Sequence, residues 1–164
     1  MSKLETIKQK ICTSDQLRAN LNRWRLLGKK IVFTNGCFDL IHLGHIDYLS
    51  KAADMGDKLV IGLNSDVSAG NLKGPGRPII DQLSRSTMLA SFSFVDAVIL
   101  FDEATPLDLI QWIEPDILVK GADYTVEQII GADLVLQKGG QVRTIDYLPG
   151  YSTTLIERKI KSGS

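Results

Sequence analysis

Short runs of β-branched and other apolar residues alternate with amphipathic helical patterns along most of the chain. The apolar runs predict five strands, over Ile31–Thr34, Lys58–Leu63, Ala97–Phe101, Ile117–Lys120 and Gln141–Ile145. Strands that alternate with helical segments are typical of βαβ units, in which the strands run parallel. The pattern therefore predicts a parallel sheet built from most of the chain.

Periodic apolar positions predict helices between these strands, over His45–Met55, Gln82–Ser91 and Pro106–Ile113, and a last helix from Ser152. The secondary structure of residues 124–138 is not decided by the pattern. Gly131 divides the segment, and Ala132–Gln137 fits a strand or a helix. The glycine pair at 139–140 indicates a C-cap. With right-handed crossovers, these elements predict an α/β fold. It is a Rossmann-like, doubly wound, five-stranded parallel sheet with helices on both faces, whose ligands bind at the carboxyl ends of the strands.

The first 28 residues predict a helical extension that precedes the sheet. A capping signal at Thr13 is followed by four apolar residues at three- and four-residue steps, and Gly28 ends the pattern. The four residues are Leu17, Leu21, Trp24 and Leu27. We therefore divide the chain into an N-terminal helical extension, residues 1–28, and a main domain, residues 29–164.

Composition narrows the classes of function. Lys and Arg together number 19, as do Asp and Glu, so the formal net charge is zero. A general nucleic-acid binder needs a basic excess, so phosphate binding has to be local. No stretch approaches the roughly 20 apolar residues of a membrane span, and the N-terminus lacks the apolar core of a signal peptide. We expect a cytoplasmic protein that binds neither nucleic acid nor membrane, with Cys12 and Cys37 as free thiols.

The segment IVFTNGCFDLIHLGH carries the strongest chemical signal. Thr34, Asn35 and Gly36 follow the first strand at its carboxyl end. The two histidines of the protein, His42 and His45, stand three apart at the mouth of the next helix. A helix N-terminus favours phosphate, and two imidazoles add donors. A zinc site lacks a third ligand of the usual kind, and the HExxH spacing of metallopeptidases is absent. Surface histidines placed by chance are the remaining alternative.

Two later segments carry groups suited to anions. The residues from Asn64 to Pro78 predict a Gly-rich loop that bears Lys73 and Arg77 and could close over an anionic substrate. The loop lacks the Walker A pattern, and a solvated turn is the alternative. Hydroxyls and free N–H groups at the start of the last helix could hold pyrophosphate, although an ordinary N-cap explains the same residues. They are Ser152, Thr153 and Thr154.

The residues HLGH, with TNGCFD before them, resemble the HxGH motif of the nucleotidyltransferase superfamily that includes cytidylyltransferases and phosphopantetheine adenylyltransferase. Within it, the stretch from Ile31 to Lys161 resembles the ADP-heptose synthase nucleotidyltransferases. The narrower match rests on NSD, LKGPGRPI, EPDILVKGADY and IIGADLVLQKGGQV followed by GYSTT. Glycerol-3-phosphate cytidylyltransferases have an Arg five residues before the motif Ser, where this chain has Tyr147, and this difference counts against a glycerol phosphate substrate.

The resemblance implies transfer of an adenylyl group from ATP to D-glycero-β-D-manno-heptose 1-phosphate, giving ADP-heptose and pyrophosphate by in-line attack. It implies catalytic roles for His42, His45 and Lys73. The expected nucleotide contacts are Thr34, Asn35, Gly36, His42, His45, Lys120, Asp123, Ser152, Thr153 and Thr154. The expected substrate contacts are Asn35, Asp66, Lys73 and Arg77. Mg²⁺ accompanies ATP, with no metal ligand expected from protein side chains.

The resemblance also implies a homodimer and a role in lipopolysaccharide core biosynthesis. In many bacteria this domain is fused to a sugar kinase, so we expect a separate heptose kinase and a phosphatase in the pathway. Asp39 is interpreted as fixing its loop, and a salt-bridged pair is an alternative for Lys120 and Asp123. Two other functions stay open: transfer to another phosphorylated acceptor such as glycerol 3-phosphate, and non-catalytic nucleotide sensing. The residues alone do not choose between ATP and CTP.

Overall fold

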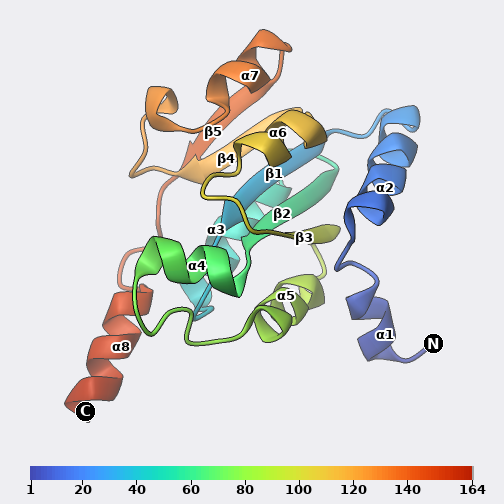
Figure 1. Cartoon of the computed structure of the whole chain (residues 1–164). Helices are drawn as coiled ribbons and strands as arrows, with labels where there is room; N and C mark the ends of the chain where they lie inside the picture. Colours follow the sequence, from blue (N-terminus) through green and yellow to red (C-terminus); the bar gives the residue numbers. More distant parts are fainter. Residues whose placement is uncertain (164) are drawn as a thin grey trace.

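The computed structural model describes residues 1–163, and it has the predicted α/β fold (Figure 1). Its strands all pair in parallel, in the order β3-β2-β1-β4-β5. The strands are β1 (Ile31–Gly36), β2 (Lys58–Asn64), β3 (Ala97–Phe101), β4 (Ile117–Gly121) and β5 (Gln141–Ile145). Each lies within two residues of its predicted position. Successive strands are added on one side of β1 up to β3 and on its other side from β4, so the strand order reverses between β1 and β4, where ligands of such folds bind.

Helices cover both faces of the sheet (Figure 1). One core cluster lies between the sheet and α2, α6 and α7, and the other between the opposite face and α3 and α5. Within β1, Ile31 and Phe33 face the first cluster and Val32 faces the second. Because both faces are buried, the strands are continuous apolar runs in the sequence.

The helices are α1 (Lys3–Lys8), α2 (Ser14–Leu26), α3 (Leu43–Ala53), α4 (Asp66–Lys73), α5 (Gln82–Ser91), α6 (Leu107–Ile113), α7 (Ala132–Gln137) and α8 (Thr153–Ser162), with a 3₁₀ helix η1 (Val126–Gln128).

The N-terminal extension shares the core of the sheet domain. Leu17, Leu21 and Trp24 of α2 are buried in the first cluster, as their spacing predicts. The link between α1 and α2 runs beside the edge strand β3: the Cys12 N–H donates to the Val98 carbonyl oxygen, and the Val98 N–H donates to Lys10, both at 2.8 Å. This pairing covers part of an edge that would otherwise offer free backbone groups. The apolar pattern predicts neither α1 nor this pairing.

One predicted loop is wrong in its first half. Asp66–Lys73 forms the helix α4, whose start is capped by Ser65, because the Ser65 hydroxyl accepts the Ser68 N–H at 3.2 Å. Lys73 is therefore the last residue of a helix, and only the residues after it form the Gly-rich loop. Gly74 and Gly76 in that loop have positive φ values of 95° and 78°, a conformation that favours glycine.

Two further ambiguities are resolved. The segment 124–138 contains η1 and α7, so Ala132–Gln137 is a helix and not a strand. The helix after β1 is capped by His42, three residues before the predicted start at His45. In residues 1–163 no helix is both long and apolar enough to cross a membrane. Cys12 and Cys37 are free and buried, as predicted.

Candidate active site

A cavity of about 850 Å³ lies at the carboxyl ends of β1 and β4. Its walls come from the loop after β1, the start of α3, the end of α4, the loop after β4 and the start of α8. Most of the predicted site residues line it: Asn35, Gly36, His42, His45, Lys73, Arg77, Lys120, Asp123, Ser152, Thr153 and Thr154. The cavity has the size of a site for a nucleotide-sized ligand.

The two histidines are fixed by backbone groups at the start of α3. His42 Nδ1 accepts the Gly44 N–H at 3.1 Å, and His45 Nδ1 accepts the His42 N–H at 3.3 Å. A neutral imidazole that accepts at Nδ1 carries its proton on Nε2, so each ring keeps one N–H donor. The rings stack with their centroids 3.9 Å apart. Burial, together with the neighbouring His42, lowers the pKa of His45 to about 4, so His45 donates as a neutral ring at pH 7.

Gly44 allows two helix N-termini to meet in the cavity. A Cβ at Gly44 would lie 3.0 Å from the ring of His42 and 3.2 Å from Cβ of Tyr151, which precedes α8. The start of α8 is capped in turn by Ser152, whose hydroxyl accepts the Leu155 N–H at 3.1 Å. Free N–H groups at the starts of α3 and α8 therefore converge on one space, which suits an extended anion.

Two lysines line the cavity without a carboxylate partner. In the part of the chain that the structure describes, neither Lys73 nor Lys120 forms an ion pair within 4.0 Å. Lys120 Nζ donates to the carbonyl oxygen of Asn35 at 3.4 Å, and burial lowers the pKa of Lys120 to about 8. The salt bridge considered between Lys120 and Asp123 is not formed, because Asp123 accepts the hydroxyl of Tyr147 at 3.0 Å. A partly buried ammonium with no carboxylate within ion-pair distance is a binding group for an anion.

Arg77 lines the cavity but already holds two carboxylates. Its Nη1 donates to Asp39 at 2.7 Å, and its Nη2 pairs with Glu157 of α8. Asp39 also accepts the N–H groups of Ile79 and Ile80 at 2.8 and 2.9 Å, so Asp39 fixes the loop as the sequence interpretation has it. The guanidinium of Arg77 is thereby committed to structure, and a contact between Arg77 and the substrate stays a prediction.

Two predicted contacts lie outside the cavity lining. Thr34 is fully buried, and its hydroxyl lies 2.8 Å from the hydroxyl of Tyr48 on α3. Asp66 lies at the start of α4 and accepts from Arg85 Nη2 at 2.7 Å. In this structure, therefore, Thr34 joins β1 to α3, and Asp66 joins α4 to α5.

Arg85 supports the site from outside the cavity lining, and sequence reasoning missed it. Its side chain is fully buried, and Nη1 donates to the carbonyl oxygens of Cys37 at 2.5 Å and Asn64 at 2.9 Å. Arg85 thus joins the ends of β1 and β2 below the cavity. The available signal was a lone Arg directly before Ser86 on the face of α5 that also buries Leu89.

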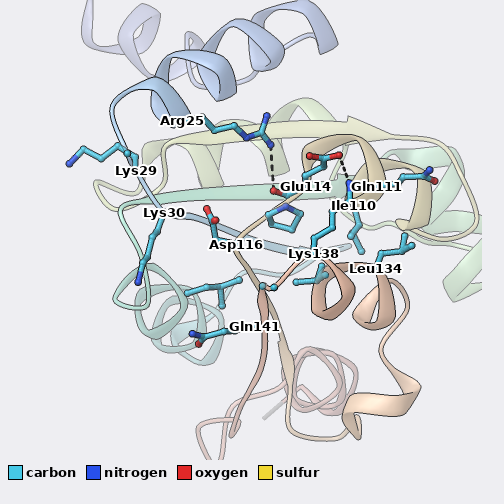
Figure 2. A pocket seen from close by; sticks show the side chains of 16 residues that line it. Arg25, Lys29, Lys30, Ile110, Gln111, Glu114, Asp116, Leu134, Lys138 and Gln141 are labelled. Carbon is cyan, nitrogen blue, oxygen red and sulfur yellow. Dashed lines mark hydrogen bonds and ion pairs between the residues drawn. The ribbon is translucent and has the colours of Figure 1, made fainter.

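A second cavity, of about 640 Å³, lies at the amino-terminal edge of the sheet (Figure 2). None of the predicted site residues lines it. Arg25 and Lys138 border it, and both are paired there: Arg25 donates to the carbonyl oxygens of Ile113 and Glu114, and Lys138 pairs with the Glu114 carboxylate. Because α2, α6 and α7 end beside this cavity, these cations lie near helix C-termini.

Comparisons with known proteins identify a family and relatives for this chain. A family model described as cytidylyltransferase-like matches residues 33–159. The chain is 53% identical over 153 residues to the bifunctional protein HldE of Methylobacillus flagellatus, an alignment that covers 93% of this chain and 31% of the relative. It is 56% identical over 133 residues to the bifunctional protein HldE of Campylobacter jejuni, covering 81% and 28%. The chain therefore spans about a third of the length of the curated relatives it matches.

Two solved structures share the fold. The crystal structure of the lipopolysaccharide core biosynthesis protein from Thermoplasma volcanium is 31% identical with a TM-score of 0.60, and the match covers 74% of this chain and 98% of that one. Pantoate-β-alanine ligase from Francisella tularensis is 14% identical with a TM-score of 0.58, covering 90% and 74%. The second likeness is one of fold alone.

Proposed function

Because the chain belongs to the cytidylyltransferase-like family, we propose that it transfers the adenylyl group of ATP to D-glycero-β-D-manno-heptose 1-phosphate and releases pyrophosphate. The nucleotidyltransferase family predicted from the HLGH motif is confirmed. Identity of about half with bifunctional HldE proteins supports the heptose branch, as does the printed name of the Thermoplasma neighbour. One observation carries the chemistry: two Nε2–H groups, two helix N-termini and two lysines without carboxylate partners line the same cavity.

The reaction requires placement and charge stabilisation more than proton transfer. A sugar phosphate is already anionic at neutral pH, so its oxygen attacks the α-phosphorus without a general base. In-line transfer then depends on aligning the two substrates and on stabilising the charge that builds on the phosphates. We assign to His42 and His45 the donation from Nε2 to the α- and β-phosphates, because their Nδ1 atoms are engaged by backbone N–H groups. Because His45 is neutral at pH 7, its N–H is available without a change of protonation.

The lysines supply the positive charge. We assign Lys73, at the end of α4, to the attacking phosphate and the α-phosphate. Lys120, at the end of β4, gains an anionic partner in the same step of binding. At the opposite wall, Ser152, Thr153 and Thr154 offer hydroxyls and free N–H groups to the β- and γ-phosphates. Asn35 and Gly36, at the end of β1, line the same cavity.

Mg²⁺ enters this account with the nucleotide. The described residues contain no group of three or more His, Cys, Asp or Glu side chains suited to a metal ion, and the Asp39 carboxylate is engaged by the 77–80 loop. We propose that the ion is held by triphosphate oxygens, with no ligand from protein side chains. When bound there, the ion neutralises part of the charge on the leaving pyrophosphate.

Pyrophosphate release by the purified protein tests the proposal. ATP and CTP are each offered with the β-anomer of heptose 1-phosphate, glycerol 3-phosphate and phosphopantetheine, with Mg²⁺ present. Turnover with ATP and heptose 1-phosphate alone supports the proposal. Turnover with glycerol 3-phosphate would replace the acceptor, and binding of ATP without turnover would favour a nucleotide sensor.

Several expectations stay predictions. They are a homodimer, a cytoplasmic location, and a separate heptose kinase and phosphatase that make and use the neighbouring intermediates. Light scattering of the purified protein measures the first of these directly.

A further inference from the structure

The helix α8 is held to the rest of the molecule by few contacts. None of its side chains is buried, whereas α2, α3 and α5 each bury several. Leu155 is 48% exposed and Ile160 is 72% exposed, and Ile156 is only partly buried, so apolar packing contributes little to docking α8. The position of α8 must therefore come from its first turn and from polar contacts.

Two contacts place α8 at the cavity. At its start, Cβ of Tyr151 lies close to Gly44 between the two histidines. One turn further on, Glu157 pairs with Arg77 Nη2, and both side chains are only about one-fifth exposed. Among the described residues, this is the one ion pair that α8 forms.

The pair continues into a chain of bonds across the cavity mouth. Arg77 Nη1 donates to Asp39 at 2.7 Å, and Asp39 accepts the N–H groups of Ile79 and Ile80. Asp39 follows β1, and Arg77 lies four residues after Lys73. Glu157 is thus the point at which α8 joins the two walls that carry the histidines and Lys73.

Helix geometry links Glu157 to the phosphate-binding turn. Residues four apart lie on the same face of a helix, so Glu157 shares a face with Thr153. Fixing the carboxylate of Glu157 therefore fixes the rotation of α8 about its axis and the direction in which the first turn points.

We propose that Glu157 is a positioning residue that, through Arg77 and Asp39, holds the N-terminus of α8 in register with the nucleotide triphosphate. The inference rests on the proposed function, because it needs a nucleotide in the cavity. Glu157 does not touch the substrates, and the loss of its charge affects nucleotide affinity more than acceptor affinity. Since α8 buries no side chain, the fold itself depends little on the pair.

Glu157→Gln tests this role, with Lys159→Gln as a control on the same helix. Calorimetric titration with Mg-ATP and with a non-hydrolysable ATP analogue measures nucleotide affinity, and steady-state kinetics give KM for each substrate. We expect Glu157→Gln to weaken nucleotide binding about 5- to 20-fold, on the order of one side-chain interaction. KM for the acceptor and the midpoint of thermal unfolding should stay close to those of the parent chain. Lys159→Gln should match the parent in every measurement.

A double-mutant cycle with Arg77→Gln separates positioning from a general loss of charge. In the Arg77→Gln background, Glu157→Gln should have no further effect on nucleotide affinity, because the bond that it removes is already gone. The inference is overturned if Glu157→Gln binds nucleotide as the parent does, or if its effect persists at full size without Arg77. It is also overturned if the KM values for both substrates rise while the unfolding midpoint falls.

The titration also separates this inference from the proposed function. A parent chain that binds a nucleotide but releases no pyrophosphate contradicts the proposed catalysis, while the affinities of the variants still decide the role of Glu157. A parent chain that binds neither ATP nor CTP overturns both.

Discussion

The sheet carries a cavity at each end, of about 850 Å³ at the carboxyl edge and about 640 Å³ at the amino edge, and charged side chains line both. They differ in which helix ends surround them. The starts of α3 and α8 lie at the carboxyl edge, and the ends of α2, α6 and α7 lie at the amino edge. In a parallel βαβ sheet this asymmetry follows from the crossover helices, which run back against the strands; α4, whose end lines the carboxyl-edge cavity, is an exception.

The two edges use positive charge differently as a result. At the amino edge, Arg25 and Lys138 neutralise helix C-termini and Glu114, as the dashed contacts in Figure 2 show. At the carboxyl edge, Lys120 lies in the same cavity as the starts of α3 and α8, whose dipoles repel it, whereas Lys73 ends α4. No ion pair of the described residues compensates either charge. A cation at a helix C-terminus is explained by the fold, whereas one at a helix N-terminus needs an external anion.

The largest expected difference between the edges is in catalysis. His45→Ala removes one Nε2–H donor from the carboxyl edge and should lower kcat about 10²- to 10³-fold. Circular dichroism should show an intact fold, because the ring of His45 is only partly buried. The rate of pyrophosphate release measures the effect, and a variant with parental turnover would remove His45 from the mechanism.

The second prediction concerns the charge of Lys120. Lys120→Met should lower kcat/KM about 10- to 100-fold, in line with the loss of a charged phosphate contact. In the parent chain only protonated Lys120 attracts the anion, and its pKa is lowered to about 8 by burial, so kcat/KM should fall as the pH rises above about 8. Lys120→Arg keeps the charge at high pH, so a fall near pH 8 that persists in this variant would assign the titration to another group.

The pH dependence of stability gives an independent test of the lowered pKa of Lys120. The pKa of Lys120 is lowered from 10.5, so between about pH 8 and 10.5 the unfolded chain binds more protons there than the folded chain. The free energy of unfolding contributed by this residue therefore rises with pH through that window. Lys120→Met should lose this rise in denaturant titrations at pH 7.5 and 9.5.

The third prediction moves to the amino edge and to stability. Arg25→Ala leaves the last carbonyl oxygens of α6 without their donor and should lower the free energy of unfolding by about 1 kcal/mol. Denaturant unfolding measures the loss. Steady-state kinetics should match the parent, since Arg25 lies at the far end of the sheet from the histidines. A change in KM for ATP would contradict the separation of the two edges.

The strands, the carboxyl-edge site and the two histidines could be predicted because local pattern determines them. Buried parallel strands are apolar runs in the sequence. The turn from β1 to α3 carries both histidines within a few residues of the strand end, so a short motif reveals them. The helix α4 was missed because two glycines, Gly70 and Gly74, lie in or directly after it, and a packed helix tolerates what the pattern penalises.

Contacts distant in sequence could not be predicted. Thr34 is predicted to contact the ligand because it is a polar residue at the end of a strand. In the folded chain its side chain instead faces Tyr48, because successive side chains of a strand point to opposite faces of the sheet. From the sequence, Arg77 is predicted to be an unpaired cation in a loop. In the folded chain it pairs with Asp39, 38 residues earlier, and with Glu157, 80 residues later. Such pairings depend on how separate elements pack, which no local pattern records.

The smallest expected effect comes from the backbone at the amino edge. Glu114 ends α6 in the left-handed region, at φ 49°, where a side chain other than Gly or Asn is strained. Glu114→Asn relieves that strain but loses the exposed pair with Lys138, so the free energy of unfolding should rise by about 0.5 kcal/mol. Glu114→Ala is the matched control, because it loses the same pair and keeps the strain. Its free energy of unfolding should be lower than that of the parent.

Denaturant midpoints rank the three chains by stability. If both variants are less stable than the parent, the pair with Lys138 outweighs the strain. The steady-state kinetics of both variants should match those of the parent, because Glu114 lies at the opposite edge of the sheet from the groups that bind the anion.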